Sequence, residues 1–170
     1  VLLEDASISG HSNLCGSSMM RHLTTVGTVP EVPVHLQAFV IEDNATIREN
    51  LIGTLEELTC VKVAGTSATE DEALAWLDAN MEHWDLVIVD LFLKQGSGLH
   101  LAQSLKRRRP TQKIVVFSNY INASVRKRCA QLGVDAVFDK STEIDSLVDY
   151  CAHQCFRVSQ AQAQAQAAAA

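Results

Sequence analysis

The chain has 170 residues, of which 47% are hydrophobic and 20% charged, and its formal net charge is −6. This length suits one domain with a substantial core rather than two. The acidic balance excludes general attraction to nucleic acid or anionic lipid. No apolar run approaches the roughly 18 residues that a membrane span requires, and no secretory signal stands at the start. We therefore expect a cytoplasmic globular protein that binds neither nucleic acid nor membrane.

The two ends of the chain differ from its middle. Residues 1–35 show no periodicity and are rich in Gly, Pro, Ser and Thr, which is typical of a flexible arm. Residues 158–170 are almost entirely Gln and Ala, so they could extend the last helix, but they have no apolar face to bury. We predict an N-terminal arm at 1–35, a single domain at 36–157 and a disordered or frayed helical tail at 158–170.

Within that domain, apolar runs of strand length alternate with segments of helical periodicity. The predicted strands cover 36–42, 61–65, 86–90, 113–118 and 134–138. The predicted helices cover 45–58, 70–80, 99–108, 121–132 and 142–156. Continuously apolar strands that alternate with helices indicate a parallel sheet covered on both faces. The pattern therefore predicts an α/β fold with a doubly wound, five-stranded parallel sheet.

Polar residues lie at the carboxyl ends of four of these strands. The first strand ends in Glu42 and Asp43, the third in Asp90 and the fourth in Ser118, and Lys140 follows the fifth. Open α/β sheets bind ligands at the carboxyl ends of their strands. Three converging carboxylates need a cation among them, and hard oxygen ligands favour Mg²⁺, while a lysine and a hydroxyl suit a phosphoryl group. Each residue alone also fits an ordinary loop position, but their joint placement favours a site.

Four segments resemble motifs of response-regulator receiver domains. They are the acidic pair in 39–44 (FVIEDN), the phosphoacceptor loop in 90–98 (DLFLKQGSG), the hydroxyl motif in 117–119 (FSN) and the lysine motif in 133–141 (GVDAVFDKS). The resemblance covers residues 36–156. It implies the flavodoxin-like strand order 2-1-3-4-5 of the family's chemotaxis regulators.

The resemblance also implies roles for individual residues. Asp90 would accept a phosphoryl group from a phosphohistidine on a histidine kinase or a histidine phosphotransfer protein. Ser118 would hydrogen-bond that group, and Lys140 would pair with it. The acyl phosphate adds charge and acceptor oxygens that bias a two-state surface.

A magnesium ion belongs to the same implied site. Asp43, Asp90 and the backbone carbonyl of Phe92 would bind Mg²⁺ directly, and Glu42 would act through a bound water molecule. Phe92 and Tyr120 would flank the path of hydrolytic water, so we expect slow loss of the phosphoryl group.

The expected output is protein binding. The resemblance implies a stand-alone receiver that signals to a separate protein through the surface of helix 4, strand 5 and helix 5. Arg126–Arg128 lie on that surface and suit either a partner site or a solvated face. The aromatic residue usual three places before the lysine is replaced by Val137, so the switch departs from the family's pattern. We expect self-phosphorylation and slow self-dephosphorylation, with no other enzymatic activity.

Two alternatives remain open at this stage. A binding module of receiver fold that is never phosphorylated would tolerate Val137. A phosphatase with an aspartate nucleophile would need a second acid two places after Asp90, where Phe92 stands and cannot protonate a leaving group.

The five cysteines form no C-x-x-C pair, and we expect reduced thiols, as in most cytoplasmic proteins. A metal site at Cys151 and Cys155 is disfavoured, because on a helix His153 points away from their shared face.

Overall fold

The computed structural model describes residues 34–169, so most of the predicted N-terminal arm (1–35) lies outside the described residues. The strands are β1 (Leu36–Ile41), β2 (Val61–Ser67), β3 (Leu86–Val89), β4 (Lys113–Ser118) and β5 (Ala136–Asp139). The helices are α1 (Ala45–Leu58), α2 (Glu70–Ala79), α3 (Gly98–Ser104), α4 (Ala123–Gln131) and α5 (Ile144–Ala169), and a 3₁₀ turn, η1 (Leu105–Arg107), follows α3.

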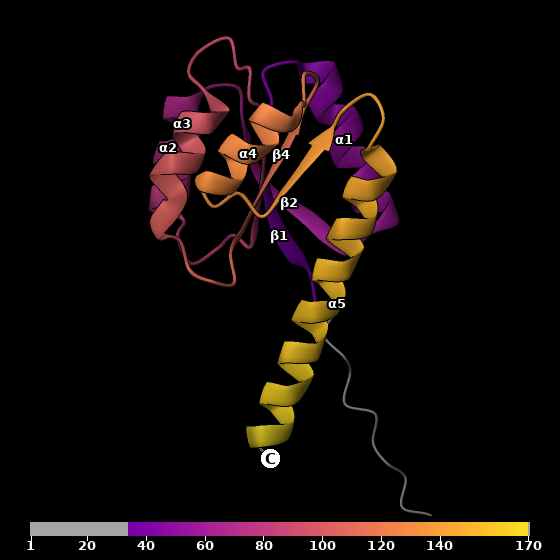
Figure 1. Cartoon of the computed structure of the whole chain (residues 1–170). Coiled ribbons are helices and arrows are strands. Elements are labelled where there is room, and N and C mark those ends of the chain that lie inside the picture. Colours follow the sequence, from indigo (N-terminus) through magenta and orange to yellow (C-terminus); the bar gives the residue numbers. More distant parts are fainter. Residues whose placement is uncertain (1–33, 170) are drawn as a thin grey trace, which may run out of the picture. The chain divides into compact units, whose positions relative to one another are not determined.

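The five strands form one parallel sheet in the order β2-β1-β3-β4-β5. This confirms the predicted flavodoxin-like, doubly wound arrangement. Helices α1 and α5 cover one face of the sheet, and α2, α3 and α4 cover the other (Figure 1). The order places β1, β3 and β4 side by side in the middle, where their tips can share one site.

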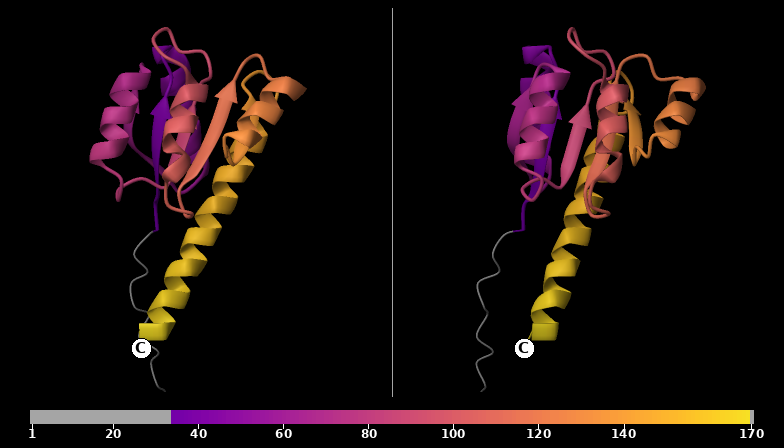
Figure 2. Two further views of the ribbon diagram at one scale, coloured as in Figure 1. Left: turned by 60° about the vertical axis from the view of Figure 1, so that its left-hand side comes forward. Right: turned by 90° about the vertical axis from the view of Figure 1, so that its left-hand side faces the viewer.

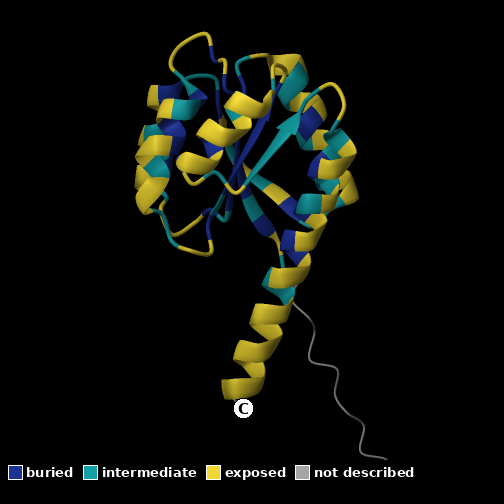
Figure 3. Ribbon diagram, viewed as in Figure 1, coloured by how far each residue is buried: buried dark blue, intermediate teal, exposed yellow. Residues whose placement is uncertain are grey.

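Alternating side chains of the central strands build two separate cores. Ala38, Val40 and Ile88 point toward α1 and α5, where they pack with residues such as Leu55 and Leu147. Their neighbours in the strands point the other way, and these are Phe39, Ile41, Val87 and Val89. Because both faces are buried, the strands read as continuous apolar runs (Figure 3).

Side-chain caps start three helices close to the strand tips. Asn44 accepts a hydrogen bond from the Ile47 amide at the start of α1, and Thr69 and Asn122 do the same for α2 and α4. Each cap satisfies a backbone donor that the first turn leaves without a partner. The helices therefore begin within a few residues of the strands before them, which keeps the loops at this edge short.

The Ala/Gln-rich segment, for which a disordered or frayed end was expected, is α-helix as far as Ala169 (Figure 2). Leu147, Cys151, Gln154 and Cys155 form the buried face of α5, and residues 160–169 are exposed. The helix propensity of Ala and Gln accounts for its continuation without packing. Within residues 34–169, no helix combines the length and apolar character that crossing a membrane would need.

A disulfide joins Cys60, at the end of the α1–β2 turn, to Cys155 on α5. The expectation of reduced thiols is therefore wrong for this pair. The two residues are 95 positions apart in sequence, but their Cα atoms lie 5.8 Å apart, within the range that a disulfide spans. Cys129 and Cys151 are free and buried, and burial raises the pKa of Cys151 to about 12, which keeps its thiol protonated and unreactive.

We predict that reduction of this disulfide lowers the free energy of unfolding by about 2–5 kcal/mol, because the bond closes a long loop in the unfolded chain. Urea denaturation of the wild type with and without reductant measures the change. The Cys60→Ser variant is the control and should unfold at the same urea concentration in both buffers. Equal midpoints for the oxidised and reduced wild type would contradict the prediction.

Candidate functional site

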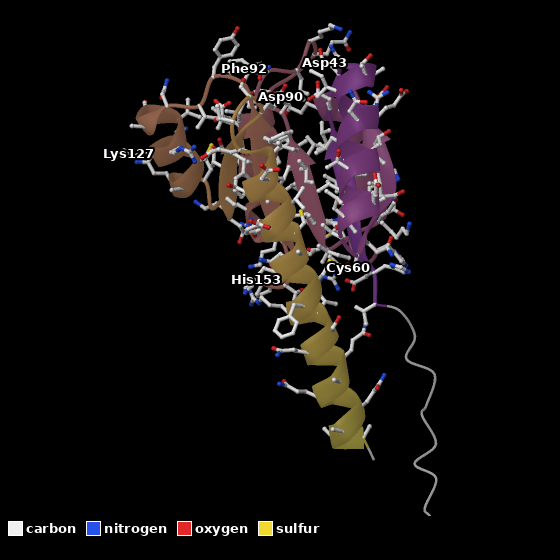
Figure 4. The ribbon with its side chains drawn as sticks, turned by 90° about the vertical axis from the view of Figure 1, so that its right-hand side faces the viewer. Asp43, Cys60, Asp90, Phe92, Lys127 and His153 are labelled. Carbon is white, nitrogen blue, oxygen red and sulfur yellow. A yellow bond between two sulfur atoms is a disulfide. The ribbon has the colours of Figure 1, made fainter. Side chains whose placement is uncertain are left out.

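The candidate site lies at the carboxyl edge of the sheet, over β1, β3 and β4. Backbone hydrogen bonds extend the sheet just past the strands: the amide of Asp90 donates to the Ile41 carbonyl at 3.0 Å, and that of Lys140 donates to the Ser118 carbonyl at 3.1 Å. Figure 4 shows Asp43, Asp90 and Phe92 together at this end of the domain, far from Cys60 and His153. The sheet itself therefore sets the spacing of the site residues.

Asp90 is the centre of the hydrogen-bond network. Its Oδ1 accepts the Ser118 hydroxyl at 2.5 Å and the Phe92 amide at 3.2 Å, and its Oδ2 accepts Lys140 Nζ at 2.5 Å. Asp90 is only 8% exposed and Ser118 is fully buried. Both oxygens of a buried carboxylate are thus oriented by fixed donors, which is the arrangement that a positioned nucleophile needs.

Lys140 reaches back from the β5–α5 loop to bridge two carboxylates. Its ammonium group contacts Glu42 Oε2 and Asp90 Oδ2, and the side chains of all three residues are at most 10% exposed. Buried charges are tolerated when they are paired and hydrogen-bonded. In this structure the cation among the clustered acids is therefore the lysine ammonium.

The two acids after β1 have different environments. The second oxygen of Glu42 accepts the Asn44 amide at 3.0 Å, so its carboxylate is fully engaged within the protein. Asp43 Oδ2 accepts the Lys94 amide at 3.2 Å and lies 3.7 Å from Lys94 Nζ, a side chain that is 80% exposed. Asp43 is therefore the acid that can exchange a mobile lysine for another cation.

The loop that follows Asp90 packs tightly against the strand tip. A side chain at Gly98 would collide with the carbonyl oxygen of Asp90, so only glycine lets the start of α3 approach this closely. The Gly98 amide donates to the Leu91 carbonyl at 3.2 Å. The glycine eight places after the acid therefore has a direct steric role in shaping the loop.

The site residues line one small cavity of about 210 Å³. Its walls include Glu42, Asp43, Asp90, Phe92, Ser118 and Lys140, with Asn44, Ile47, Asn119 and Tyr120 around them. Every residue predicted from the sequence to act in the site is thus brought to the same space. Its size suits a small ion and a phosphoryl group rather than a large organic ligand.

The donors of this cavity are oxygen atoms, the ligand type that hard cations such as Mg²⁺ take. Within residues 34–169, no cluster of three or more His, Cys, Asp or Glu side chains is arranged to hold a metal ion. Mg²⁺ instead takes one or two carboxylates, keeps several waters and binds substrate phosphate oxygens. Asp43, Asp90 and the Phe92 carbonyl are the candidate ligands, and Lys140 contacts both Glu42 and Asp90 in this structure.

Two aromatic rings stand at the mouth of the cavity. Phe92 and Tyr120 meet edge to face with their ring centroids 5.9 Å apart, and they are 59% and 78% exposed. Both residues also line the cavity that contains Asp90.

Arg126 connects the elements of the α4–β5–α5 surface beside the site. From α4, its guanidinium donates to the Val137 carbonyl on β5 at 2.6 Å and to Glu143 Oε2, just before α5, at 2.7 Å. Val137 and Phe138 point to opposite faces of the sheet, and Phe138 packs edge to face on Tyr150. Phe138 therefore does not stand in for an aromatic side chain at position 137, as the strand periodicity predicts.

One further acid near the site, Glu70 at the start of α2, was not predicted from the sequence. It is 8% exposed, and its carboxylate accepts the Ser97 amide at 2.7 Å and contacts the His100 ring. Acids are common in the first turn of a helix, where they favour the helix dipole, so the pattern alone indicates only an exposed residue.

A five-stranded parallel sheet with an acid cluster, a hydroxyl and a lysine at its carboxyl edge defines a receiver-type signalling domain. Residues 38–152 match the family described as response regulator receiver domain. The chain belongs to this family. The motifs recognised in the sequence lie within the matched segment or at its edge.

Individual relatives agree with this assignment. The response regulator protein VraR of Staphylococcus aureus is 23% identical over 114 residues, which cover 67% of this chain and 54% of that protein. The chain thus spans about half the length of the curated relatives it matches. Whether the receiver acts as a stand-alone protein therefore stays a prediction.

Solved structures show the same fold. A CheY-like receiver domain protein from Methanospirillum hungatei superposes with a TM-score of 0.62 at 20% identity, covering 75% of this chain and 98% of that one. A DNA-binding response regulator of the LuxR family from Staphylococcus aureus superposes with a TM-score of 0.61 at 14% identity, covering 73% and 98%.

We predict that Lys140→Ala lowers the free energy of unfolding by about 3–5 kcal/mol in magnesium-free buffer, because it leaves Glu42 and Asp90 buried without their shared cation. Urea denaturation measures the loss. Adding Asp90→Asn to this variant should recover part of it, because one buried charge is removed. Lys127→Ala, on the exposed surface of α4 (Figure 4), is the control and should change stability by less than about 0.5 kcal/mol. Equal stability of the two lysine variants would contradict the prediction.

Proposed function

We propose that this receiver domain accepts a phosphoryl group on Asp90 and transmits the event through a change of its surface. The observation that carries the proposal is the convergence of Ser118 and Lys140 on the two oxygens of Asp90 inside one small cavity. A nucleophile held between a hydroxyl and an ammonium has next to it the groups that a bound phosphoryl group requires.

The transfer has simple chemistry. An Asp90 oxygen attacks phosphorus, and the bond from phosphorus to the imidazole nitrogen of a phosphohistidine breaks, with its electron pair returning to the ring. The product is an acyl phosphate and a histidine that takes a proton from solvent. The residues mainly position the groups and offset negative charge, as in other phosphoryl transfers.

In the proposed transfer, Lys140 and Ser118 each bind one group before the reaction and another group after it. Before transfer they bind the carboxylate of Asp90, and afterwards they bind oxygens of the phosphoryl group. Mg²⁺ held by Asp43, Asp90 and the Phe92 carbonyl would neutralise charge on the equatorial oxygens, and Glu42 would assist through water. We propose the cytoplasm as the compartment, because Mg²⁺ and histidine kinases would meet the domain there, although the reducing conditions of that compartment disfavour the Cys60–Cys155 disulfide.

The signal passes to the neighbouring loops when Ser118 moves with its new partner. Ser118 ends β4, and the loop behind it leads into α4, which Arg126 ties to β5 and to Glu143. A shift of this loop therefore acts on the α4–β5–α5 surface, where we propose that a downstream protein target binds. Histidine kinases or histidine phosphotransfer proteins are the proposed donors.

We predict that incubation with acetyl phosphate and Mg²⁺ adds one phosphoryl group to the wild type, as measured by intact mass. Asp90→Asn should gain none, because the amide is no nucleophile. Chelation of Mg²⁺ should abolish the adduct in the wild type.

The outcomes separate the remaining candidates. A folded wild type that gains no adduct at saturating donor would favour the unphosphorylated binding module. Continuous hydrolysis of a small phosphoester would favour the phosphatase, and either result would overturn the proposal.

The aromatic pair bears on how long the signal lasts. Phe92 and Tyr120 cover the approach to Asp90, so we propose that they hinder the water that would hydrolyse the acyl phosphate. Slow loss of the phosphoryl group follows from this shielding.

We predict that Phe92→Ala shortens the lifetime of the phosphorylated form at least about threefold, because roughly 0.7 kcal/mol of barrier suffices for that change. Decay of the adduct after removal of donor measures it. Phe156→Ala is the matched control, because Phe156 has the same exposed fraction of 59% but lies on α5 outside the cavity. A wild-type lifetime of seconds, unchanged in Phe92→Ala, would contradict the shielding.

A further inference from the structure

Glu70 is an acid in an unusual place. It is the first residue of α2, where a charged side chain normally faces water, but here it is only 8% exposed. Lys, Glu, Arg and Asp are almost never this buried unless they are paired. Its burial therefore indicates specific partners, and these all come from the segment that runs from the β3–α3 loop to the first turn of α3.

Three contacts connect Glu70 to that segment. Its Oε2 accepts the backbone amide of Ser97 at 2.7 Å, and its Oε1 contacts Nδ1 of His100. Its own amide donates to the Gln95 carbonyl at 3.2 Å. One residue of α2 thus holds the end of the phosphoacceptor loop and the start of α3.

The loop is shaped to fit against this acid. Gly96 has a φ of 96°, and a side chain there would collide with the Cβ and carboxylate of Glu70. Only glycine combines this backbone conformation with so close an approach. The backbone at Gly96 and the side chain of Glu70 therefore also fit together sterically, in addition to the hydrogen bonds.

The electrostatics of the contact favour the ionised acid. Burial alone raises the pKa of Glu70, but the hydrogen bonds from His100 and from the Ser97 amide outweigh it, so the pKa lies below its ordinary value. An ionised acceptor makes hydrogen bonds about twice as strong as a neutral one. The side chain is thus an effective anchor for the loop.

The anchored loop carries groups of the phosphorylation site. Asp90 begins it, Phe92 lines the cavity, and the Lys94 amide donates to Asp43 Oδ2. The loop is consequently held near its middle by Asp43 and at its far end by Glu70. Leu91 and Leu93 are also buried in the core, and the Phe92 amide donates to Asp90 Oδ1.

We propose that Glu70 is a positioning residue for phosphoryl acceptance: it holds the β3–α3 loop so that the Phe92 carbonyl and Asp90 keep the geometry that a cation requires. The inference deepens the proposed function of the same site and rests on it. Glu70 touches no reacting atom. Partners that orient metal ligands from outside the site are known to affect metal affinity strongly.

Three variants test the proposal on the full chain. Glu70→Ala removes the anchor, and Glu70→Gln keeps an oxygen that can accept the Ser97 amide while removing the charge. Glu56→Ala is the matched control, because Glu56 also accepts a backbone amide, that of Val63 at 3.0 Å, but it lies on α1 away from the loop.

The first measurement needs neither metal nor phosphodonor. Amide hydrogen exchange over residues 91–98 should be about tenfold faster in Glu70→Ala than in the wild type, in line with loss of a charged hydrogen bond. Glu70→Gln should stay within about threefold of the wild type, and Glu56→Ala should not change this segment.

The second measurement concerns the site. By titration calorimetry, the dissociation constant of Mg²⁺ should rise roughly three- to tenfold in Glu70→Ala, less than the 10–100-fold typical of direct partners of metal ligands. The rate of phosphorylation by acetyl phosphate should fall at low Mg²⁺ and recover at saturating Mg²⁺. Thermal melting of each variant checks that it is folded.

The outcomes are distinguishable from a failure of the proposed function. If the wild type gains no phosphoryl group, phosphoryl acceptance fails, whatever the exchange data show. If the wild type is phosphorylated while Glu70→Ala matches it in exchange and Mg²⁺ affinity, the positioning role is overturned. Equal effects of Ala and Gln would also overturn it, because Gln keeps an oxygen that can accept the Ser97 amide and should preserve part of the loop contact.

Discussion

The ammonium group of Lys140 is the interaction on which the site depends. It bridges the carboxylates of Glu42 and Asp90 in a space where none of the three side chains is more than 10% exposed. Without a cation there, two buried carboxylates on adjacent strand tips would face each other with unfavourable repulsion. The lysine holds Asp90 beside Ser118, which gives this carboxylate the position that the proposed phosphoryl acceptance requires.

This arrangement follows from the parallel sheet. Because all strands run in the same direction, the residues that follow β1, β3, β4 and β5 arrive at one edge, although they are up to 98 positions apart in sequence. The rest of the domain keeps this edge rigid: two cores pack against opposite faces, and capped helices start within a few residues of the tips. The fold positions the site residues, and the polar side chains at the strand ends supply the chemical groups of the site.

Much of this could be read from the sequence, because strands buried on both faces are visible as apolar runs and the polar residues after them mark a common edge. The end of α3 was harder: the helical pattern suggested residues up to 108, but the helix ends at Ser104, and Arg108 leaves it to bind the Gly133 carbonyl and Asp135. Contacts between residues far apart in sequence have no recognisable pattern in the local sequence. Neither the pairing of Cys60 with Cys155 nor the burial of Glu70 could be inferred, since each depends on where a second element packs.

The disulfide between Cys60 and Cys155 has a mechanical consequence for α5. Cys155 lies near the middle of this 26-residue helix, so the bond joins the centre of α5 to the turn between α1 and β2. The Lys140 loop leads directly into the first turn of the same helix, whose buried face packs on the core through Leu147 and Cys151. The covalent bond and this packing together oppose sliding of α5 along the sheet.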